Sequence, residues 1–168
     1  MKKIFAITMI FLSTLSMFAE EFAVENAKAK VAILYHDTDL KKQLLSKLTE
    51  DLNSRQISVI TDNIVNGEKH PAELYDAVVL LSRIEKFGPH ETATDYIKKN
   101  KYSNKIIYLS TYLKFNNPYG LMNLSLDKDR IDAITTASPG KGEKINTEEI
   151  LKAHAEIMRR IMELISGR

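Results

Sequence analysis

Apolar residues along the chain alternate between strand-like runs and helical spacing. Compact apolar runs typical of buried strands lie at 31–35, 57–60, 77–82, 105–111 and 131–136. Between several of these runs, apolar residues instead recur every three or four positions, as expected for amphipathic helices. This alternation predicts right-handed crossovers and a parallel sheet with helices on both faces. We therefore expect an α/β three-layer sandwich with a five-stranded parallel sheet of order 2-1-3-4-5.

Helix boundaries are marked by residues that favour helix ends. Pro89 suits the first turn of a helix, so we expect one from Gly88 to about Lys99. The last helix carries a long apolar stripe, and Asn146 or Thr147 is expected to cap it. His154 lies on that stripe and is expected in the core or at its boundary.

The beginning of the chain has the order of an export signal. Lys2 and Lys3 form a basic start, Ile4–Leu12 is mostly apolar, and small and apolar residues continue to Ala19. The apolar run is shorter than the roughly 20 residues of a membrane-spanning helix, which disfavours an uncleaved anchor. We expect residues 1–19 to be removed, and the product to be periplasmic or secreted, with no membrane insertion after cleavage.

Composition places the remainder among ordinary globular domains. Hydrophobic residues make up 44% and charged residues 27% of the sequence, so one domain over 30–168 can form a core behind a leader over 20–29. There is no cysteine, which excludes disulfides and thiolate metal sites. Loss of Lys2 and Lys3 changes 24 basic and 22 acidic residues into 22 of each, so nucleic acid is not an expected partner.

Three stretches make the chain resemble the flavodoxin-like family over about residues 30–166. KVAILYHDTD resembles the first strand and its phosphate turn. YDAVVLLSRIEKFGPHETATDYIKKN resembles the third strand, the loop beside the flavin and the next helix, and NKIIYLSTY resembles the fourth strand with the start of the second flavin loop. The resemblance implies a flavodoxin-like fold and a ligand crevice at the strand ends.

The phosphate turn itself is changed in this chain. Flavodoxins bind the flavin phosphate in a turn of the type Ser/Thr-x-Thr-Gly-x-Thr, where hydroxyls, backbone N–H groups and a glycine surround the anion. The corresponding residues, His36 to Leu40, contain no glycine, keep one hydroxyl at Thr38, and place Asp37 and Asp39 in this space. Like charges a few ångströms apart repel by on the order of 1–4 kcal/mol. We therefore expect no bound cofactor, with FMN held partly by Thr38 as the alternative.

Titratable side chains follow the first and third strands of the predicted sheet. His36 and Asp37 come after the first strand, and His90 follows the third. These strand ends meet where the strand order reverses, which is the usual ligand crevice of an open α/β sheet. Two imidazoles and a carboxylate there could bind a divalent metal or act as an acid/base pair. The alternative is that Asp37 caps the helix and the other residues are solvated.

Aromatic residues gather in the loops that flank the flavin in the family. They are Phe87, Tyr112, Phe115 and Tyr119. Such rings could stack on a planar ligand, or they could instead cover the edge of the sheet. The Ser138–Gly142 loop is expected to be a turn, because it lacks the full spacing of a phosphate-binding loop. His70 precedes Pro71 in another predicted loop and is expected to face solvent.

No complete catalytic motif occurs in the sequence. It contains neither a Gly-x-Ser-x-Gly pattern nor a recognisable Ser-His-Asp arrangement, so catalytic residues stay unassigned and the question of enzymatic activity stays open. Our leading hypothesis is an exported, non-catalytic flavodoxin-like module whose strand-end loops bind an unidentified protein or a small planar ligand. The alternatives are an FMN-dependent electron-transfer protein or reductase, and a metal-dependent enzyme at the strand ends.

Overall fold

The computed structural model describes residues 20–22, 26–85, 88–113, 131–138 and 144–167. The expected signal peptide and most of the Ser138–Gly142 loop lie outside these ranges, so both stay predictions. In the part of the chain that the structure describes, no helix combines the length and apolarity needed to cross a membrane.

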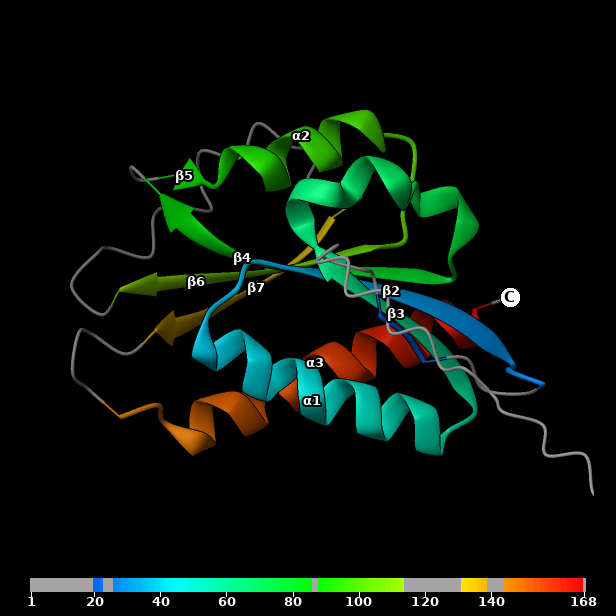
Figure 1. Cartoon of the computed structure of the whole chain (residues 1–168), viewed down its shortest axis with the longest axis horizontal. Coiled ribbons are helices and arrows are strands. Elements are labelled where there is room, and N and C mark those ends of the chain that lie inside the picture. Colours follow the sequence, from blue (N-terminus) through cyan, green and yellow to red (C-terminus); the bar gives the residue numbers. More distant parts are fainter. Residues whose placement is uncertain (1–19, 23–25, 86–87, 114–130, 139–143, 168) are drawn as a thin grey trace, which may run out of the picture.

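Strands and helices alternate along most of the chain, with two short 3₁₀ helices between the second long strand and the third. In order, the elements are β1 (Glu20–Phe22), β2 (Ala29–Tyr35), α1 (Asp39–Ser54), β3 (Ile57–Asn63), η1 (Ile64–Lys69), η2 (Ala72–Leu74), β4 (Ala77–Glu85), β5 (Gly88–Pro89), α2 (Glu91–Lys99), β6 (Ile106–Leu113), β7 (Ile131–Ser138) and α3 (Thr147–Ser166). Figure 1 shows these elements in sequence colours, with the carboxyl ends of β6 and β7 at the left.

The strands form one sheet in the order β1-β3-β2-β4-β6-β7, with β5 paired to β4 off this path. β2 lies between β3 and β4 and pairs in parallel with both, with Val31 opposite Val59 on one side and Ala77 on the other. β6 pairs in parallel with β4, and β7 pairs in parallel with β6. The strand order therefore reverses between β2 and β4, where the ligand crevice of such sheets lies.

The predicted α/β fold with a parallel sheet is confirmed, but the sheet also contains two short antiparallel strands that the sequence did not predict. The order 2-1-3-4 is found in β3-β2-β4-β6, with β7 beyond β6, and two short antiparallel strands are added. β1, inside the expected leader, pairs with β3, and β5 pairs with β4. β5 occupies Gly88–Pro89, so α2 begins only at Glu91. Strands of two or three residues have no periodicity from which a sequence could predict them.

Helices cover both faces of the sheet and give three layers. α1 and α3 lie on one face, while α2 lies with η1 and η2 on the other (Figure 1). The alternation of β2 decides which side chains meet which layer, since successive strand residues point to opposite faces. Val31 and Ile33 pack with α1 and α3, whereas Ala32 and Leu34 pack on the other side.

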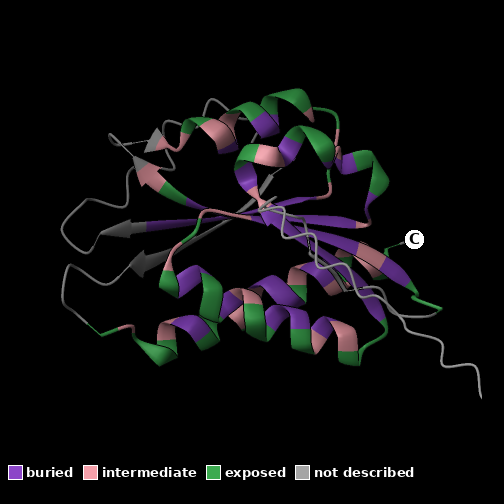
Figure 2. Ribbon diagram, in the orientation of Figure 1, coloured by how far each residue is buried: buried purple, intermediate pink, exposed green. Residues whose placement is uncertain are grey.

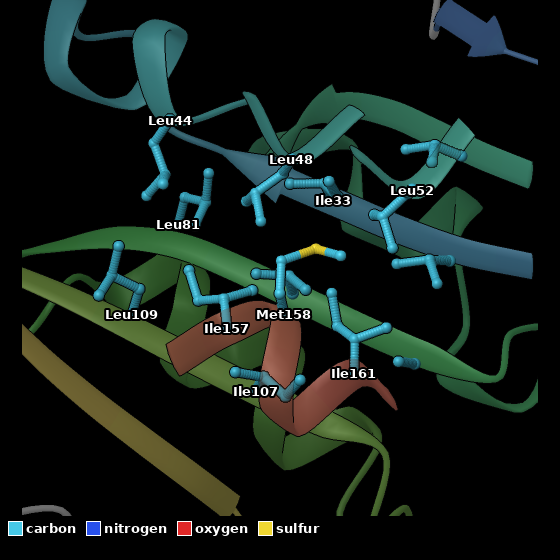
Figure 3. Close-up of a cluster of buried hydrophobic side chains, with 14 of the residues drawn as sticks. Ile33, Leu44, Leu48, Leu52, Leu81, Ile107, Leu109, Ile157, Met158 and Ile161 are labelled. Carbon is cyan, nitrogen blue, oxygen red and sulfur yellow. The ribbon is translucent and has the colours of Figure 1, made fainter. Parts of the chain in front are cut away.

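The larger core joins the two helices of one face. Leu44, Leu48 and Leu52 of α1 point toward β2, and Ile157 and Ile161 of α3 approach the same cluster (Figure 3). Figure 2 shows the corresponding buried stripes on both helices, with exposed residues on their outer sides. Burial of such side chains stabilises the fold by about 1.5–3 kcal/mol each. The stripes were predicted from the spacing of apolar residues, and this prediction is confirmed.

Side chains at the starts of α2 and α3 cap these two helices. Asn146 caps α3, accepting a hydrogen bond of 3.0 Å from the backbone N–H of Glu148, as one of the two predicted caps. His90 caps α2, because its Nδ1 accepts from the N–H of Thr92 at 3.3 Å. This cap fixes His90 directly after β5, at the start of α2.

Candidate functional site

Two histidines from distant parts of the sequence are in contact at the carboxyl ends of β2 and β4. The ring centroids of His36 and His90 lie 4.2 Å apart with an interplanar angle of 56°. His36 directly follows β2, and its backbone N–H donates to the carbonyl of Leu81 in β4 at 3.0 Å. His90 is held by its own N–H, which donates to the carbonyl of Arg83 at 3.1 Å. The adjacent parallel strands thus bring both rings to the point where the strand order reverses.

The hydroxyl of Thr92 joins the two rings. Thr92 Oγ1 lies 3.1 Å from His36 Nε2 and 2.9 Å from His90 Nδ1. A hydroxyl has one proton to donate, so it donates to one imidazole nitrogen and accepts from the other if that nitrogen is protonated. On its other side, His36 Nδ1 lies 3.3 Å from Ser82 Oγ. Both ring nitrogens of His36 therefore contact hydroxyl groups.

His36 is a neutral imidazole near neutral pH. Burial, followed by the charges of His90, Lys41 and Arg83, lowers the pKa of His36 to about 3. Among the side chains that the structure describes, no carboxylate acts on this ring. The surroundings of His36 are therefore positive as well as partly buried.

Lys41 is the member of this cluster that the sequence patterns did not single out. It lies in the first turn of α1 and is only 1% exposed. Burial, and then the charge of Arg83, lowers the pKa of Lys41 to about 8. Among the described residues, no carboxylate pairs with Lys41. The available signal was its spacing, because Lys41 is three residues before Leu44 and seven before Leu48 on the inward stripe.

The two carboxylates expected to repel a phosphate are exposed. Asp37 Oδ1 pairs with Lys42 Nζ at 2.7 Å, and both side chains are more than half exposed. Asp39 is also exposed, in the first turn of α1. Neither carboxylate is among the charges that shift the pKa of His36 or Lys41. The repulsion between these two carboxylates and a bound phosphate is therefore smaller than the sequence indicated, because both side chains are exposed.

Thr38 precedes α1 with extended backbone, at φ −144° and ψ 151°. Its carbonyl accepts the first helical hydrogen bond, from the N–H of Lys42 at 2.9 Å, but its hydroxyl does not cap the helix. The first N–H groups of a helix need a partner outside the helix, and they carry partial positive charge. The leading N–H groups of α1 therefore receive no capping hydrogen bond from the Thr38 side chain.

The predicted metal set is only partly brought together. His36 and His90 are neighbours, whereas the carboxylate of Asp37 pairs with Lys42. Over the described ranges, no group of three His, Asp or Glu side chains is arranged to hold a metal ion.

The predicted aromatic set lies largely outside the residues that the structure describes. Phe87, Phe115 and Tyr119 lie outside the described residues, and so does the side chain of Tyr112, whose backbone lies in β6.

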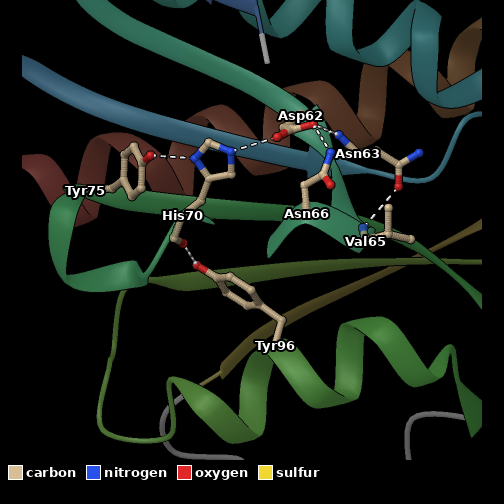
Figure 4. Close-up of polar contacts among 7 residues, drawn as sticks. All are labelled: Asp62, Asn63, Val65, Asn66, His70, Tyr75 and Tyr96. Carbon is tan, nitrogen blue, oxygen red and sulfur yellow. Dashed lines mark hydrogen bonds and ion pairs between the residues drawn. The ribbon is translucent and has the colours of Figure 1, made fainter. Parts of the chain in front are cut away.

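A second polar cluster lies between β3 and the segment that leads to β4. His70 Nε2 lies 2.9 Å from Asp62 Oδ2, and His70 Nδ1 lies 2.8 Å from the hydroxyl of Tyr75 (Figure 4). Tyr96 of α2 donates to the carbonyl of His70 at 2.7 Å. The prediction that His70 faces solvent is wrong, since the residue is 6% exposed. Its partners come from β3, from the residue that follows η2, and from α2, which the local sequence around Pro71 does not indicate.

This cluster is satisfied internally, which favours a structural role. Burial alone raises the pKa of Asp62, but hydrogen bonds from Asn66, His70 and the N–H of Asn63 together lower it below the ordinary value. The carboxylate accepts at 2.8 Å from Asn66 Nδ2 and at 2.7 Å from Asn63 N. The cluster lies beside a hollow of about 290 Å³ between η1 and α2. Thr92 lines this hollow and also contacts His36 and His90, so the hollow adjoins the two histidines.

Comparison with known proteins defines the class of fold. No family model matches the chain, and no curated protein does so either. Among solved structures, a flavodoxin from the domain Archaea has a TM-score of 0.58 at 8% sequence identity, with 80% of this chain and 98% of that chain covered. The flavodoxin of Megasphaera elsdenii has a TM-score of 0.52 at 9% identity, covering 82% of this chain and 99% of that one.

A third similar structure is the Flv1 flavodiiron core from Synechocystis sp. PCC6803, with a TM-score of 0.59 at 9% identity. It covers 85% of this chain, which spans only 38% of the length of that protein. The fold of this chain is flavodoxin-like, as the sequence resemblance implied. At these identities the likeness concerns the fold alone, and the function must be argued from the site.

Proposed function

We propose that this chain is an exported flavodoxin-like binding module that holds a small ligand at the rim formed by His36, Lys41, Arg83, His90 and Thr92. The observation that carries the proposal is the contact of His36 with His90 and Thr92 beside the buried Lys41, where no carboxylate of the described residues acts on His36 or Lys41. Buried positive charge without a counter-charge destabilises a fold, so its presence favours a role in binding. Export is supported by the order of basic, apolar and small residues before Glu20.

The rim has the position and composition of a binding site more than of a catalytic site. It lies at the strand-order reversal between β2 and β4, where open α/β sheets bind ligands. His36 is neutral, and both of its ring nitrogens already contact hydroxyl groups. Among the residues that the structure describes at the rim, no nucleophile with an activating carboxylate-bound base is evident. A binding role therefore accounts for these side chains without any further group.

An FMN-dependent electron-transfer protein or reductase is the second candidate. It is favoured by the flavodoxin-like fold and by the uncapped first turn of α1, at the position where the resemblance places the flavin phosphate. The outward placement of Asp37 and Asp39 makes this turn more suitable for an anion than the sequence indicated. Thr38 and Lys41 would hold the phosphate. The flavin would supply the redox chemistry, and the protein would bind and orient it.

A metal-dependent enzyme at the rim is less favoured, because the third ligand proposed for His36 and His90 pairs with Lys42 instead. Adding Zn²⁺ or Mn²⁺ to the apo protein and following thermal unfolding would test this hypothesis. Stabilisation that is lost in His36→Ala would revive it. Equal unfolding temperatures with and without metal would count against it.

The first experiment is a visible spectrum of the exported protein, followed by titration with FMN and with riboflavin. Saturable quenching of flavin fluorescence at micromolar concentrations, weakened by Thr92→Val and His36→Ala, would support ligand binding at the rim. The exposed variant Lys152→Ala, on α3, is the matched control, since its side chain pairs with Glu148 on the outer surface. If flavins and a panel of small phosphorylated and carboxylated compounds all fail to bind, the proposed binding function is wrong.

A further inference from the structure

The hollow of about 290 Å³ between η1 and α2 is a second candidate for a ligand site. It lies on the face of the sheet opposite α1 and α3 (Figure 1). Thr92 is the residue that it shares with the rim, and neither His36 nor His90 lines it. Sites for small ligands usually enclose roughly 300–1,000 Å³, so a hollow of this size suits a small molecule.

The two walls of the hollow are held together by close contacts. A Cβ on Gly67 of η1 would lie only 2.7 Å from Cδ2 of Tyr96, so the backbone of η1 lies directly against this ring of α2. The hydroxyl of Tyr96 donates to the carbonyl of His70 at 2.7 Å (Figure 4). Asn100 Oδ1 accepts from the backbone N–H of Ala72 at 2.9 Å. The hollow is therefore preformed, which reduces the entropy lost when a ligand binds.

Apolar side chains line part of the hollow. Ile64 and Tyr96 are buried, and Pro71 lies beside them at half-buried depth. Val65 also lines the hollow, although it is 60% exposed. A hydrocarbon or aromatic group of a ligand would cover this exposed apolar surface, which is favourable in proportion to the area removed from water.

Carboxylates come from both walls of the hollow. Glu68 belongs to η1 and Asp95 to α2, and both are exposed. In the part of the chain that the structure describes, neither carboxylate forms an ion pair. Lys99, one turn after Asp95, is the basic residue among the described lining residues, so two negative charges stand against one positive charge. This balance favours a cationic ligand, because an ammonium group forms charge-assisted hydrogen bonds with carboxylates.

We propose that the hollow binds a small organic cation, a primary amine whose ammonium group pairs with Glu68 and Asp95. The apolar body of the amine packs on the apolar side chains of η1 and α2. This inference goes beyond the proposed function, since the site lies outside the strand-end rim and takes a ligand of different chemistry. Thr92, which contacts the two histidines and also lines the hollow, places the bound amine beside them.

Phenethylamine is the first probe, titrated into the purified protein in a calorimeter. Phenylpropionate is the matched control ligand, because it has a similar aromatic body but carries a carboxylate in place of the ammonium. The expected result is saturable binding of phenethylamine, weakened by added salt because both carboxylates are exposed. Phenylpropionate should not bind. Equal binding of both compounds, or binding of neither, would overturn the inference.

Two pairs of variants test the charges. Glu68→Gln and Asp95→Asn should each weaken phenethylamine binding by about tenfold or more. Glu91→Gln is the control, since Glu91 is an exposed carboxylate of α2 that does not line the hollow. Lys99→Ala should leave the affinity unchanged or raise it, because it removes a positive charge. A loss that is equal in Glu68→Gln and Glu91→Gln would show that the amine responds to general charge and would overturn the site.

Two exposed apolar residues test the contact with the body of the ligand. Val65 and Leu74 are 60% and 61% exposed, but only Val65 lines the hollow. Val65→Ser should weaken phenethylamine binding, whereas Leu74→Ser should retain it. Thermal unfolding of each variant checks that the fold is kept. Equal affinities in these two variants would contradict the proposed position of the apolar body.

The variant His36→Ala separates the hollow from the rim. Phenethylamine binding that persists in His36→Ala but is weakened in Glu68→Gln would support the hollow, whether or not flavins or other anions bind at the rim. Binding that is lost in His36→Ala and kept in Glu68→Gln would overturn the inference and place the amine at the rim instead.

Discussion

The imidazole rings of His36 and His90 lie 4.2 Å apart, and the hydroxyl of Thr92 contacts both of them. This contact joins the end of β2 to the start of α2 across the point where the strand order reverses. It also holds His36 in surroundings where burial and neighbouring positive groups favour the neutral ring. The most direct consequence is a dependence of stability on pH.

His36 is expected to make the fold less stable in mild acid. Its pKa is about 3 in the folded protein and near 6.5 when unfolded, so the unfolded chain binds a proton in this interval that the folded chain does not. The free energy of unfolding should therefore fall as the pH decreases from about 6.5 toward 3. Denaturant unfolding at several pH values should show a smaller fall for His36→Gln than for the unmodified chain. Equal pH profiles would contradict the assignment.

Replacing Lys41 with methionine should stabilise the ligand-free protein. The pKa of Lys41 is lowered to about 8, so at neutral pH the folded state carries an unfavourable buried charge that methionine lacks. We expect the free energy of unfolding to rise by on the order of 1–3 kcal/mol. Lys42→Met should change it by less than about 0.5 kcal/mol, since that side chain is exposed. A strongly destabilised Lys41→Met would mean that the amine has a structural partner.

Asp62 should be important for stability although it lies outside the rim. Asp62→Asn replaces an acceptor of three hydrogen bonds with an amide that places a donor against His70 or Asn66. We expect a loss of about 1–3 kcal/mol. Because the pKa of Asp62 is lowered on folding, its contribution is present above the ordinary carboxyl pKa and decreases as the pH falls below it. The exposed Glu73→Gln should show neither effect in the same denaturation series.

Gly67 is needed where η1 approaches α2. A Cβ at this position would lie 2.7 Å from Cδ2 of Tyr96, whose ring is buried and whose hydroxyl is bonded to His70. Gly67→Ala should therefore destabilise the fold by about 1–3 kcal/mol through overpacking. Gly167→Ala is the control, because its Cβ would meet only a helix carbonyl at 3.3 Å near the exposed end of α3. Similar unfolding midpoints for both variants would refute this interpretation.

Export can be tested by the mass of the product. Expressed with its full amino-terminal segment in a bacterial host, the chain should accumulate in the periplasm or medium and begin at Glu20. A charged substitution in the apolar run, such as Leu12→Asp, should leave an uncleaved product in the cytoplasm. Recovery of the unmodified chain in the membrane fraction with residues 1–19 still attached would contradict the prediction of a cleaved signal.

The α/β architecture could be read from the sequence because its evidence is local. The apolar runs of β2, β4 and β6 and the stripes of α1 and α3 each reveal their element without reference to the rest of the chain. The strand order then followed from general rules of handedness and crossover. The short strands β1 and β5 could not be predicted in this way, since pairing with a longer strand, and not a pattern of their own, defines them.

The chemistry of the rim depended on the tertiary structure. The sequence placed His36 and His90 after strands that meet at one edge, and their approach followed from that placement. It could not show that Asp37 turns outward to Lys42, or that Lys41 is buried without a partner among the described residues. Nor could it show that His70 is enclosed by Asp62 and Tyr75. Burial and charge balance are sums over neighbours from several elements, so they are decided only when β2, β4, α1 and α2 are packed together.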